Sequence, residues 1–366
     1  MTALPPIANA TGASVTEGGF KSWLTDLRAM LAETIGATGG GQSDAASGSV
    51  FRRNAWYNGA MQVWQRGTGS TSSSAGSRTY LADRIYVNPA GAALNQLRSA
   101  TIPSGSRVQY SLELQGAASV TAVLVGQRLI ASDIPRIKRT ITFQAQVQNL
   151  SGAAFNPSLL IGTPNAADDF TTVVNRLTQS LQSCTDSAWT QVSHTVDISA
   201  YTNIDNGLQV ELQIPSGSLV SGDTVRITEV QLAASAVVTT LDVLPFAEEL
   251  SRCLPYYAKS FLYATVPVQN AGLNTGETTW AGYLAAALAT NYEIVYPVRM
   301  RATPTHTWFN PAAANALVRD RNASADTTSN STVNATERGI TVQATQNAAH
   351  AAGGFNCVHW TAAAEP

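Results

Sequence analysis

The sequence predicts a mainly β protein, in which an antiparallel β-sandwich of the jelly-roll type precedes a smaller β-rich domain. Apolar and polar residues alternate in short runs such as 140–150 and 207–215. A period of two is typical of strands with one buried and one wet face. Pro, Gly and Ser clusters separate the runs, as turns require. Helical patterns do not alternate with these strands, which excludes a doubly wound parallel sheet.

One strand pattern contains a break. Within residues 224–233, Val225 and Ile227 share one face, but the apolar parity then moves to Val230 and Leu232. An extra residue in one strand of an antiparallel pair produces such a shift. We therefore predict a β-bulge near Thr228.

Composition excludes several classes of protein. The 366 residues are 44% hydrophobic but only 13% charged, and 22 basic against 24 acidic residues leave a formal net charge of -2. A charge-driven nucleic-acid binder would need a basic excess. No apolar run is long enough for a transmembrane helix, and the N-terminus lacks the charged and apolar regions of a signal peptide. We expect neither nucleic-acid binding nor membrane insertion.

Catalytic and metal-binding patterns are also missing from the sequence. Cys184, Cys253 and Cys357 lie far apart and fit small buried residues better than disulfides or zinc ligands. The four histidines lack metalloprotease spacing, and no phosphate loop or nucleophile elbow occurs. Neighbouring acids such as Asp168 and Asp169 point to opposite sides of a strand and make no local catalytic pair. We expect no catalytic, cofactor or metal site, and no enzymatic activity.

The first 35 residues predict an amphipathic helix that needs a partner. Its apolar stripe is formed by Phe20, Trp23, Leu24, Leu27 and Leu31. An isolated helix of this length is marginal in water. The stripe therefore predicts self-association or docking on another protein, and folding back onto the main domain is the alternative.

The remaining boundaries follow from changes in composition and period. Residues 36–50 are rich in Gly, Ser and Ala and predict a flexible linker. Residues 51–245 form the predicted sandwich, 246–257 a helical connector that starts after Pro245, and 258–366 a β-rich tip domain.

Three blocks of sequence resemble one family. They are NGAMQVWQRGT with YLADR at residues 58–84, VQL with PFAEELSRC and YY at 230–257, and PVRMRATP at 297–304. In this order and spacing they are similar to a β-sandwich module of bacteriophage and prophage tail fibres, which resembles carbohydrate-binding modules. Ile85 stands where the family usually has Trp, and Leu254-Pro255 where it usually has Gln-Arg.

The resemblance implies a virion structural protein of a tailed phage, a receptor-binding tail fibre that attaches to a host surface glycan. It implies a homotrimer, held to other tail or baseplate proteins through residues 1–35, and made in the bacterial cytoplasm without a signal peptide. A decorating, head or baseplate fibre without receptor activity is the alternative. A glycan depolymerase ranks below both, since no β-helix repeat is visible.

One group of candidate residues concerns the structure at the start of the sandwich. The signature of the resemblance is carried by Asn58, Trp64, Arg66, Asp83 and Arg84. A guanidinium fork fits a carboxylate, so we expect Arg66 or Arg84 to pair with Asp83 and pin the first segment, with a sugar site as the rival interpretation.

Aromatic residues concentrate in the last 90 residues, and residues 322–336 are rich in Asn, Ser and Thr. Aromatic faces with neutral polar side chains suit sugar recognition. Trp280 and Trp308 are the glycan-binding candidates, and filling of the domain core is the alternative for each.

Overall fold

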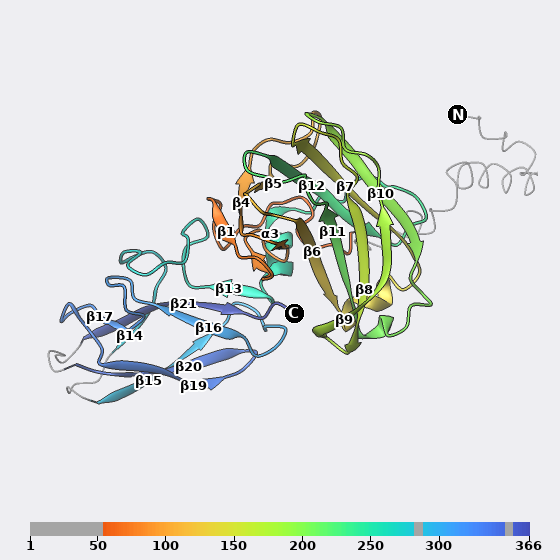
Figure 1. The fold of residues 1–366 in the computed structure, drawn as a ribbon. Coiled ribbons are helices and arrows are strands. Elements are labelled where there is room, and N and C mark those ends of the chain that lie inside the picture. The colour runs from red at the N-terminus through yellow and green to blue at the C-terminus, as the bar shows by residue number, and fades with distance from the viewer. Residues whose placement is uncertain (1–53, 282–287, 348–353) are drawn as a thin grey trace, which may run out of the picture.

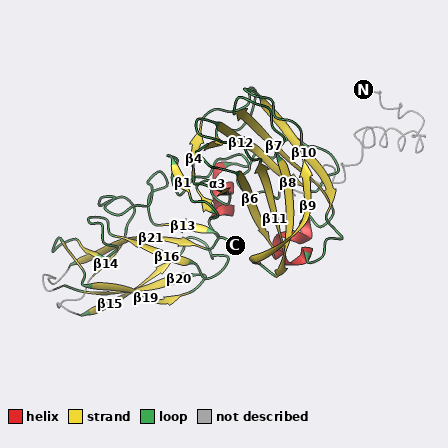
Figure 2. Ribbon diagram, in the orientation of Figure 1, coloured by secondary structure: helices red, strands yellow, loops and turns green. Residues whose placement is uncertain are grey.

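The computed structural model describes residues 54–281, 288–347 and 354–366. It is mainly β, as predicted (Figures 1 and 2). The predicted N-terminal helix, with Phe20, Trp23, Leu24, Leu27 and Leu31, and the linker at 36–50 lie outside the described residues.

Twelve strands build the sandwich as two six-stranded antiparallel sheets. The first sheet has the order β1 (Thr71–Ser73), β4 (Leu94–Ser99), β5 (Ser111–Gln115), β12 (Thr224–Ala233), β7 (Thr140–Leu150), β10 (Trp189–Asp197). The second sheet has the order β2 (Thr79–Tyr80), β3 (Tyr86–Ala90), β6 (Ala122–Ile130), β11 (Gly207–Ile214), β8 (Ser158–Ala166), β9 (Asp169–Ser180). Two short 3₁₀ helices, Ala131–Arg136 and Ile204–Asn206, join strands of the sandwich.

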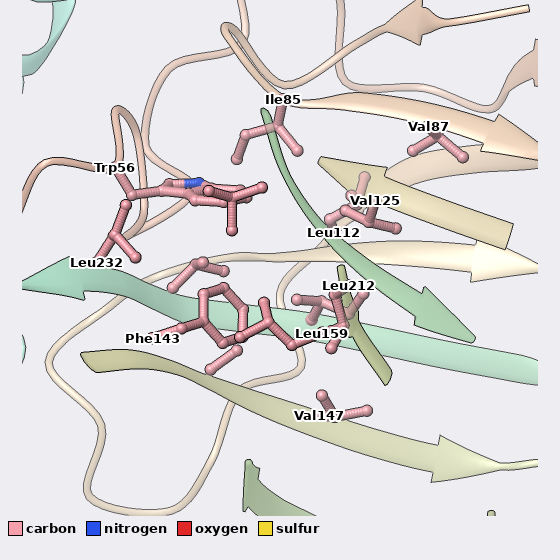
Figure 3. Close-up of a cluster of buried hydrophobic side chains, with 14 of the residues drawn as sticks. Trp56, Ile85, Val87, Leu112, Val125, Phe143, Val147, Leu159, Leu212 and Leu232 are labelled. Atoms are coloured by element: carbon pink, nitrogen blue, oxygen red, sulfur yellow. The ribbon is translucent and has the colours of Figure 1, made fainter. Parts of the chain in front are cut away.

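The apolar faces of the two sheets enclose one core (Figure 3). Leu112 and Val147 come from the first sheet, Val125 and Leu212 from the second, and all four are buried. Trp56, which precedes the first strand, packs edge-on against Phe143 with ring centroids 6.0 Å apart. A ring of this size fills the end of the core where short strands alone would leave a void.

The predicted bulge is confirmed. The pairing of β12 with β7 shifts register between Thr228 and Gln231, and Glu229 takes a φ of 51°. The shift leaves Val230 outside the ladder, and its N–H donates instead to Gly59 O at 2.9 Å. The bulge therefore provides the docking point for the segment that precedes the first strand.

The connector contains the helix α3 (Phe246–Cys253), which starts after Pro245 as predicted. The helix is shorter than residues 246–257, because Tyr257 already begins β13. Its buried side is formed by Glu249 and Cys253, whereas Phe246 is 42% exposed. The buried Glu249 carboxylate is stabilised by the Asn58 N–H at 2.8 Å, a contact that periodicity cannot predict.

The second module, β13–β21, packs two more sheets around a separate core. The larger sheet follows the order β13 (Tyr257–Lys259), β21 (Phe355–Ala363), β17 (Arg319–Asp320), β18 (Ala325–Asp326), and β14 (Thr278–Ala281) and β16 (Thr305–Phe309) also pair with β21. The smaller sheet has the order β15 (Ala289–Val295), β20 (Gly339–Thr345), β19 (Ser329–Ala335). Residues 322–336, expected as polar loops, thus include an edge strand.

The three cysteines are buried and unpaired, as predicted. Burial raises the pKa of Cys184 to about 11 and that of Cys357 to about 12, so both stay protonated at neutral pH. Within residues 54–281, 288–347 and 354–366, no helix is long and apolar enough to cross a membrane.

Candidate functional site

A shallow pocket of about 270 Å³ lies in the second module and is lined by Thr279, Arg321, Asn322 and Phe355. We call it the tip pocket. Its residues belong to β14, to the start of β21 and to the turn after β17. The labels of β14 and β17 lie at the end of this module that faces away from the sandwich (Figure 1). The pocket therefore lies toward the outer end of the second module.

Phe355 supplies an exposed aromatic ring. It begins β21 and pairs with Ala281, while Thr279 pairs with Cys357 two residues further along. Residues two apart on a strand share a face, so Thr279 and Phe355 lie on the same side of the sheet. The side chain of Phe355 is not needed for the core and remains 52% exposed. Its ring is available for contact with a ligand.

The polar side of the pocket is shaped by a tight turn. The Asp320 carboxylate accepts the backbone N–H groups of Asn322 and Ala323, each at 3.0 Å. An aspartate that accepts the N–H two residues on is a recurrent turn motif. The Arg321 N–H donates to Phe355 O at 2.8 Å, which fastens the turn beside the aromatic ring.

The positive charge of Arg321 is compensated within the module. Its guanidinium donates to Glu277 Oε1 at 3.3 Å and to Asn274 Oδ1 at 2.9 Å. Burial by itself would raise the pKa of Glu277, but backbone N–H groups of the loop 274–277 and the nearby His359 bring that pKa below its ordinary value. The carboxylate therefore remains ionised, and the arginine fork is held in place.

The pocket thus combines one apolar ring with a fixed guanidinium, an amide and a hydroxyl. The four lining residues include no carboxylic acid. Such a set can stack against the C–H face of a sugar and hydrogen-bond its hydroxyls. The size suits one sugar unit. Among the described residues, no group of three or more potential metal ligands gathers anywhere.

The two predicted glycan candidates lie away from this pocket. Trp280 is only 7% exposed and stacks on Tyr292 at 4.9 Å inside the core. Trp308 is half-buried, packs against the same core and pairs with Trp360, five residues along β21 from Phe355. The rings fill the module, as the alternative interpretation had it, and leave little surface for a sugar.

The residues that form the pocket were not identified from sequence, apart from Asn322, which falls in the polar segment 322–336. Phe355 alternates with Asn356 and Cys357 in an ordinary strand pattern. Nothing local marks its side chain as the one that stays exposed.

The signature residues form one connected structure at the entry to the sandwich. Asn58 is fully buried with a φ of 57°, and its amide donates to Val63 O at 2.9 Å and Asp83 O at 3.1 Å. Its carbonyl oxygen accepts the N–H groups of Gln62 and Val63. The indole of Trp64 is buried and donates to Met61 O at 2.6 Å. The segment is therefore held by side chains rather than by strand pairing.

The expected pair of Arg66 and Asp83 is present, with Arg66 Nη1 2.7 Å from Asp83 Oδ1. Arg84 does not take that partner. It pairs with Glu365, which also binds Arg66 Nη2 at 3.0 Å. The arginine stacks over Tyr256 at 3.5 Å from the ring centroid. Since Glu365 follows β21, these residues join the sandwich to the second module, and no exposed sugar site results.

Comparisons with known proteins leave the family open. No family model and no curated protein matches the sequence. Among solved structures, the chain is similar to the enzymatically active domain of tailspike protein 4 from bacteriophage CBA120, with a TM-score of 0.32 and 11% identity over 49% of this chain. The match spans 21% of the tailspike chain.

Carbohydrate-binding modules are matched at a similar level. The C-terminal family 22 module of Clostridium thermocellum Xyn10B gives a TM-score of 0.33 at 12% identity, over 52% of this chain and 98% of that one. The CBM22-2 xylan-binding domain of Paenibacillus barcinonensis Xyn10C gives 0.29 at 14% identity, over 41% and 91%. Likenesses this distant carry no conclusion about what the chain binds.

Proposed function

We propose that the chain is an attachment protein of a tailed phage virion, which binds a glycan on the host cell surface through the tip pocket. The observation that carries this proposal is an exposed aromatic ring, Phe355, beside the fixed guanidinium of Arg321 and the polar side chains of Asn322 and Thr279. The tail-fibre signature at residues 58–84 supports the same assignment.

We further propose that the protein binds its glycan without cleaving it. Glycoside hydrolysis normally requires two carboxyl groups beside the scissile bond, one of them free to donate a proton. Two acids contact the pocket lining: Asp320, whose carboxylate accepts the N–H groups of Asn322 and Ala323, and Glu277. The Glu277 carboxylate is buried and already bound to Arg321 and two backbone N–H groups. This environment holds its pKa low and makes it a poor proton donor at neutral pH.

Attachment through a single small pocket would be weak, and several copies would strengthen it. The apolar stripe predicted within residues 1–35 would assemble three chains and hold them to the particle. Linked copies convert the second and third binding events into intramolecular ones, which raises the overall affinity without new contacts.

The test compares the full chain with Phe355→Ala in retention on susceptible and resistant host cells. Val295→Ala is the matched control, since Val295 is a 71% exposed apolar residue of the same module. We expect saturable retention on susceptible cells only, loss of about tenfold for Phe355→Ala, and no change for Val295→Ala. Equal retention of all three proteins would show that the tip pocket does not mediate attachment. Failure of the unaltered, folded chain to bind would leave a decorating role.

A further inference from the structure

The outer face of the first sheet carries a row of large side chains that crosses five strands. In register, Trp189 on β10 lies opposite Gln148 on β7, and Gln148 opposite Arg226 on β12. Arg226 lies opposite Glu113 on β5, which lies opposite Leu97 on β4. Paired residues of neighbouring strands share a face, so all five side chains stand on the same surface. At about 4.8 Å per strand spacing, the row is about 19 Å long.

The middle of the row is fixed by hydrogen bonds. Arg226 Nε donates to Glu113 Oε2 at 2.7 Å, and Arg226 Nη1 donates to Gln148 Oε1 at 2.8 Å. Gln115 donates to the other Glu113 oxygen at 3.1 Å. Burial would raise the pKa of Glu113, but these bonds and the Arg226 charge lower it overall. The carboxylate and guanidinium therefore cancel each other's charge.

A second row beside the first consists of neutral side chains. Gln146 lies opposite Gln191 on β10 and opposite Thr228 on β12. Gln191 is exposed and Gln146 half-buried, and neither amide makes a hydrogen bond with another described residue. This part of the face thus offers donors and acceptors to a ligand without a net charge.

On the other half of the same sheet face, the side chains of Thr142 and Gln144 bind a segment of the chain itself. There, residues 234–243 run over the sheet outside any helix or strand. Gln144 Nε2 donates to Thr239 O at 2.8 Å, and Thr142 Oγ1 donates to Ser235 O at 2.9 Å. Gln144 Oε1 accepts the Thr239 N–H at 3.1 Å. Amides and hydroxyls of this face therefore already hold the backbone of one chain segment, with no hydrogen bond among the described residues from that segment to Gln146.

We propose that the uncovered half is a second glycan-binding site, formed by Trp189, Gln191, Gln146, Gln148 and Arg226, for an extended neutral polysaccharide. The half-buried indole of Trp189 at the sheet edge stacks on one sugar ring. The amides donate to and accept from hydroxyl groups along the chain, as Gln144 does with the backbone carbonyl and N–H of Thr239. The compensated pair Arg226 and Glu113 selects against polyanions. This site does not depend on the tip pocket, which takes a single sugar unit.

Affinity electrophoresis of the full chain through gels containing soluble mannan, galactan, β-glucan or xylan tests the proposal, with alginate as the polyanion. We expect retardation by at least one neutral polymer and none by alginate. Trp189→Ala should weaken that retardation about tenfold, and Gln191→Ala should weaken it less. Because Gln191 is exposed on an edge strand, its substitution leaves the core intact.

One control separates this site from other exposed aromatic surfaces. Phe246→Ala removes a 42% exposed ring on α3 and should be retarded like the unaltered chain. Unchanged retardation of folded Trp189→Ala and Gln191→Ala would overturn the proposal. So would the absence of retardation by every neutral polymer, or stronger retardation by alginate.

Discussion

Glu365 is the residue on which the joint between the two modules depends. Its carboxylate pairs with Arg84, whose side chain is fully buried, and with Arg66. Burial of a guanidinium is unfavourable unless its charge is matched nearby. The charge of Glu365 raises the pKa of Arg84 despite that burial.

Glu365→Ala should therefore destabilise the protein strongly, because it leaves Arg84 buried without its carboxylate. We expect a loss of about 3 kcal/mol in the free energy of unfolding, measured by urea denaturation. Glu337→Ala is the control. It breaks a pair with Arg299, whose side chain is 68% exposed, and should cost less than about 1 kcal/mol. Similar losses in the two variants would contradict the role of Glu365.

One buried and one half-buried histidine should make stability depend on pH. Burial lowers the pKa of both His306 and His359 to about 4. The unfolded chain protonates these groups near pH 6.5, so it binds more protons than the folded chain between about pH 6.5 and 4. The free energy of unfolding should be constant above this window and fall as the pH drops through it.

Urea midpoints at a series of pH values from about 7.5 to 4.5 measure this dependence. His359 is bonded on both ring nitrogens, to Ser260 at 3.0 Å and Thr275 at 2.8 Å, so His359→Gln keeps part of that network while it removes the titration. The variant should be less stable at pH 7.5 but show a shallower decline. An undiminished slope would assign the pH dependence to other groups.

At the scale of elements, the bulge in β12 and the segment 54–61 form one unit. The bulge frees Val230, whose N–H donates to Gly59 O and whose carbonyl accepts the Asn54 amide at 2.9 Å. The segment approaches so closely that a Cβ on Gly59 would lie 1.9 Å from Val230 O. A glycine at position 59 is therefore required by this backbone contact.

Gly59→Ala should therefore push the segment off the bulge and destabilise the sandwich by about 2 kcal/mol. Gly69→Ala is the matched control, because no atom lies within 4 Å of the added Cβ. Its effect should stay within about 0.5 kcal/mol. Thermal unfolding of both variants compares them directly, and equal melting temperatures would mean that the Gly59 contact relaxes without cost.

At the scale of the whole molecule, assembly is predicted from residues outside the described structure. The resemblance to tail fibres implies a trimer, which the stripe with Leu24 and Leu27 would hold together, so sedimentation of the full chain should give three times the chain mass. Leu24→Glu with Leu27→Glu puts charges into the stripe and should give monomers. Ser22→Glu with Thr25→Glu, off the stripe, should leave the trimer intact. A monomeric unaltered chain would contradict the predicted homotrimer.

The described structure also joins the modules through side chains that lie far apart in sequence. Arg128 on β6 donates to Pro366 O at 2.7 Å, and Glu365 binds Arg66 and Arg84. The end of the second module thereby packs against the edge of the sandwich. A contact held by several buried charges favours a stiff joint over a flexible hinge.

The β class, the bulge, the buried cysteines and the start of α3 could all be predicted from local patterns, because each depends on a local period or on one residue's conformational preference. The contact of Arg66 with Asp83 could also be anticipated, since the two lie in neighbouring segments of one motif. Periodicity says which residues alternate along a strand and does not say which sheet covers them.

The exposure of individual aromatic rings and the partners of residues far apart in sequence depend on the tertiary structure. It buried Trp280 and exposed Phe355, two aromatic residues at the ends of paired strands, because just one of them faces the second sheet of the module. It gave Arg84 the partner Glu365, 281 positions away. It brought Trp189, Gln148 and Arg226 into one row, which follows from strand order. Strand order depends on long-range pairing that no local pattern contains.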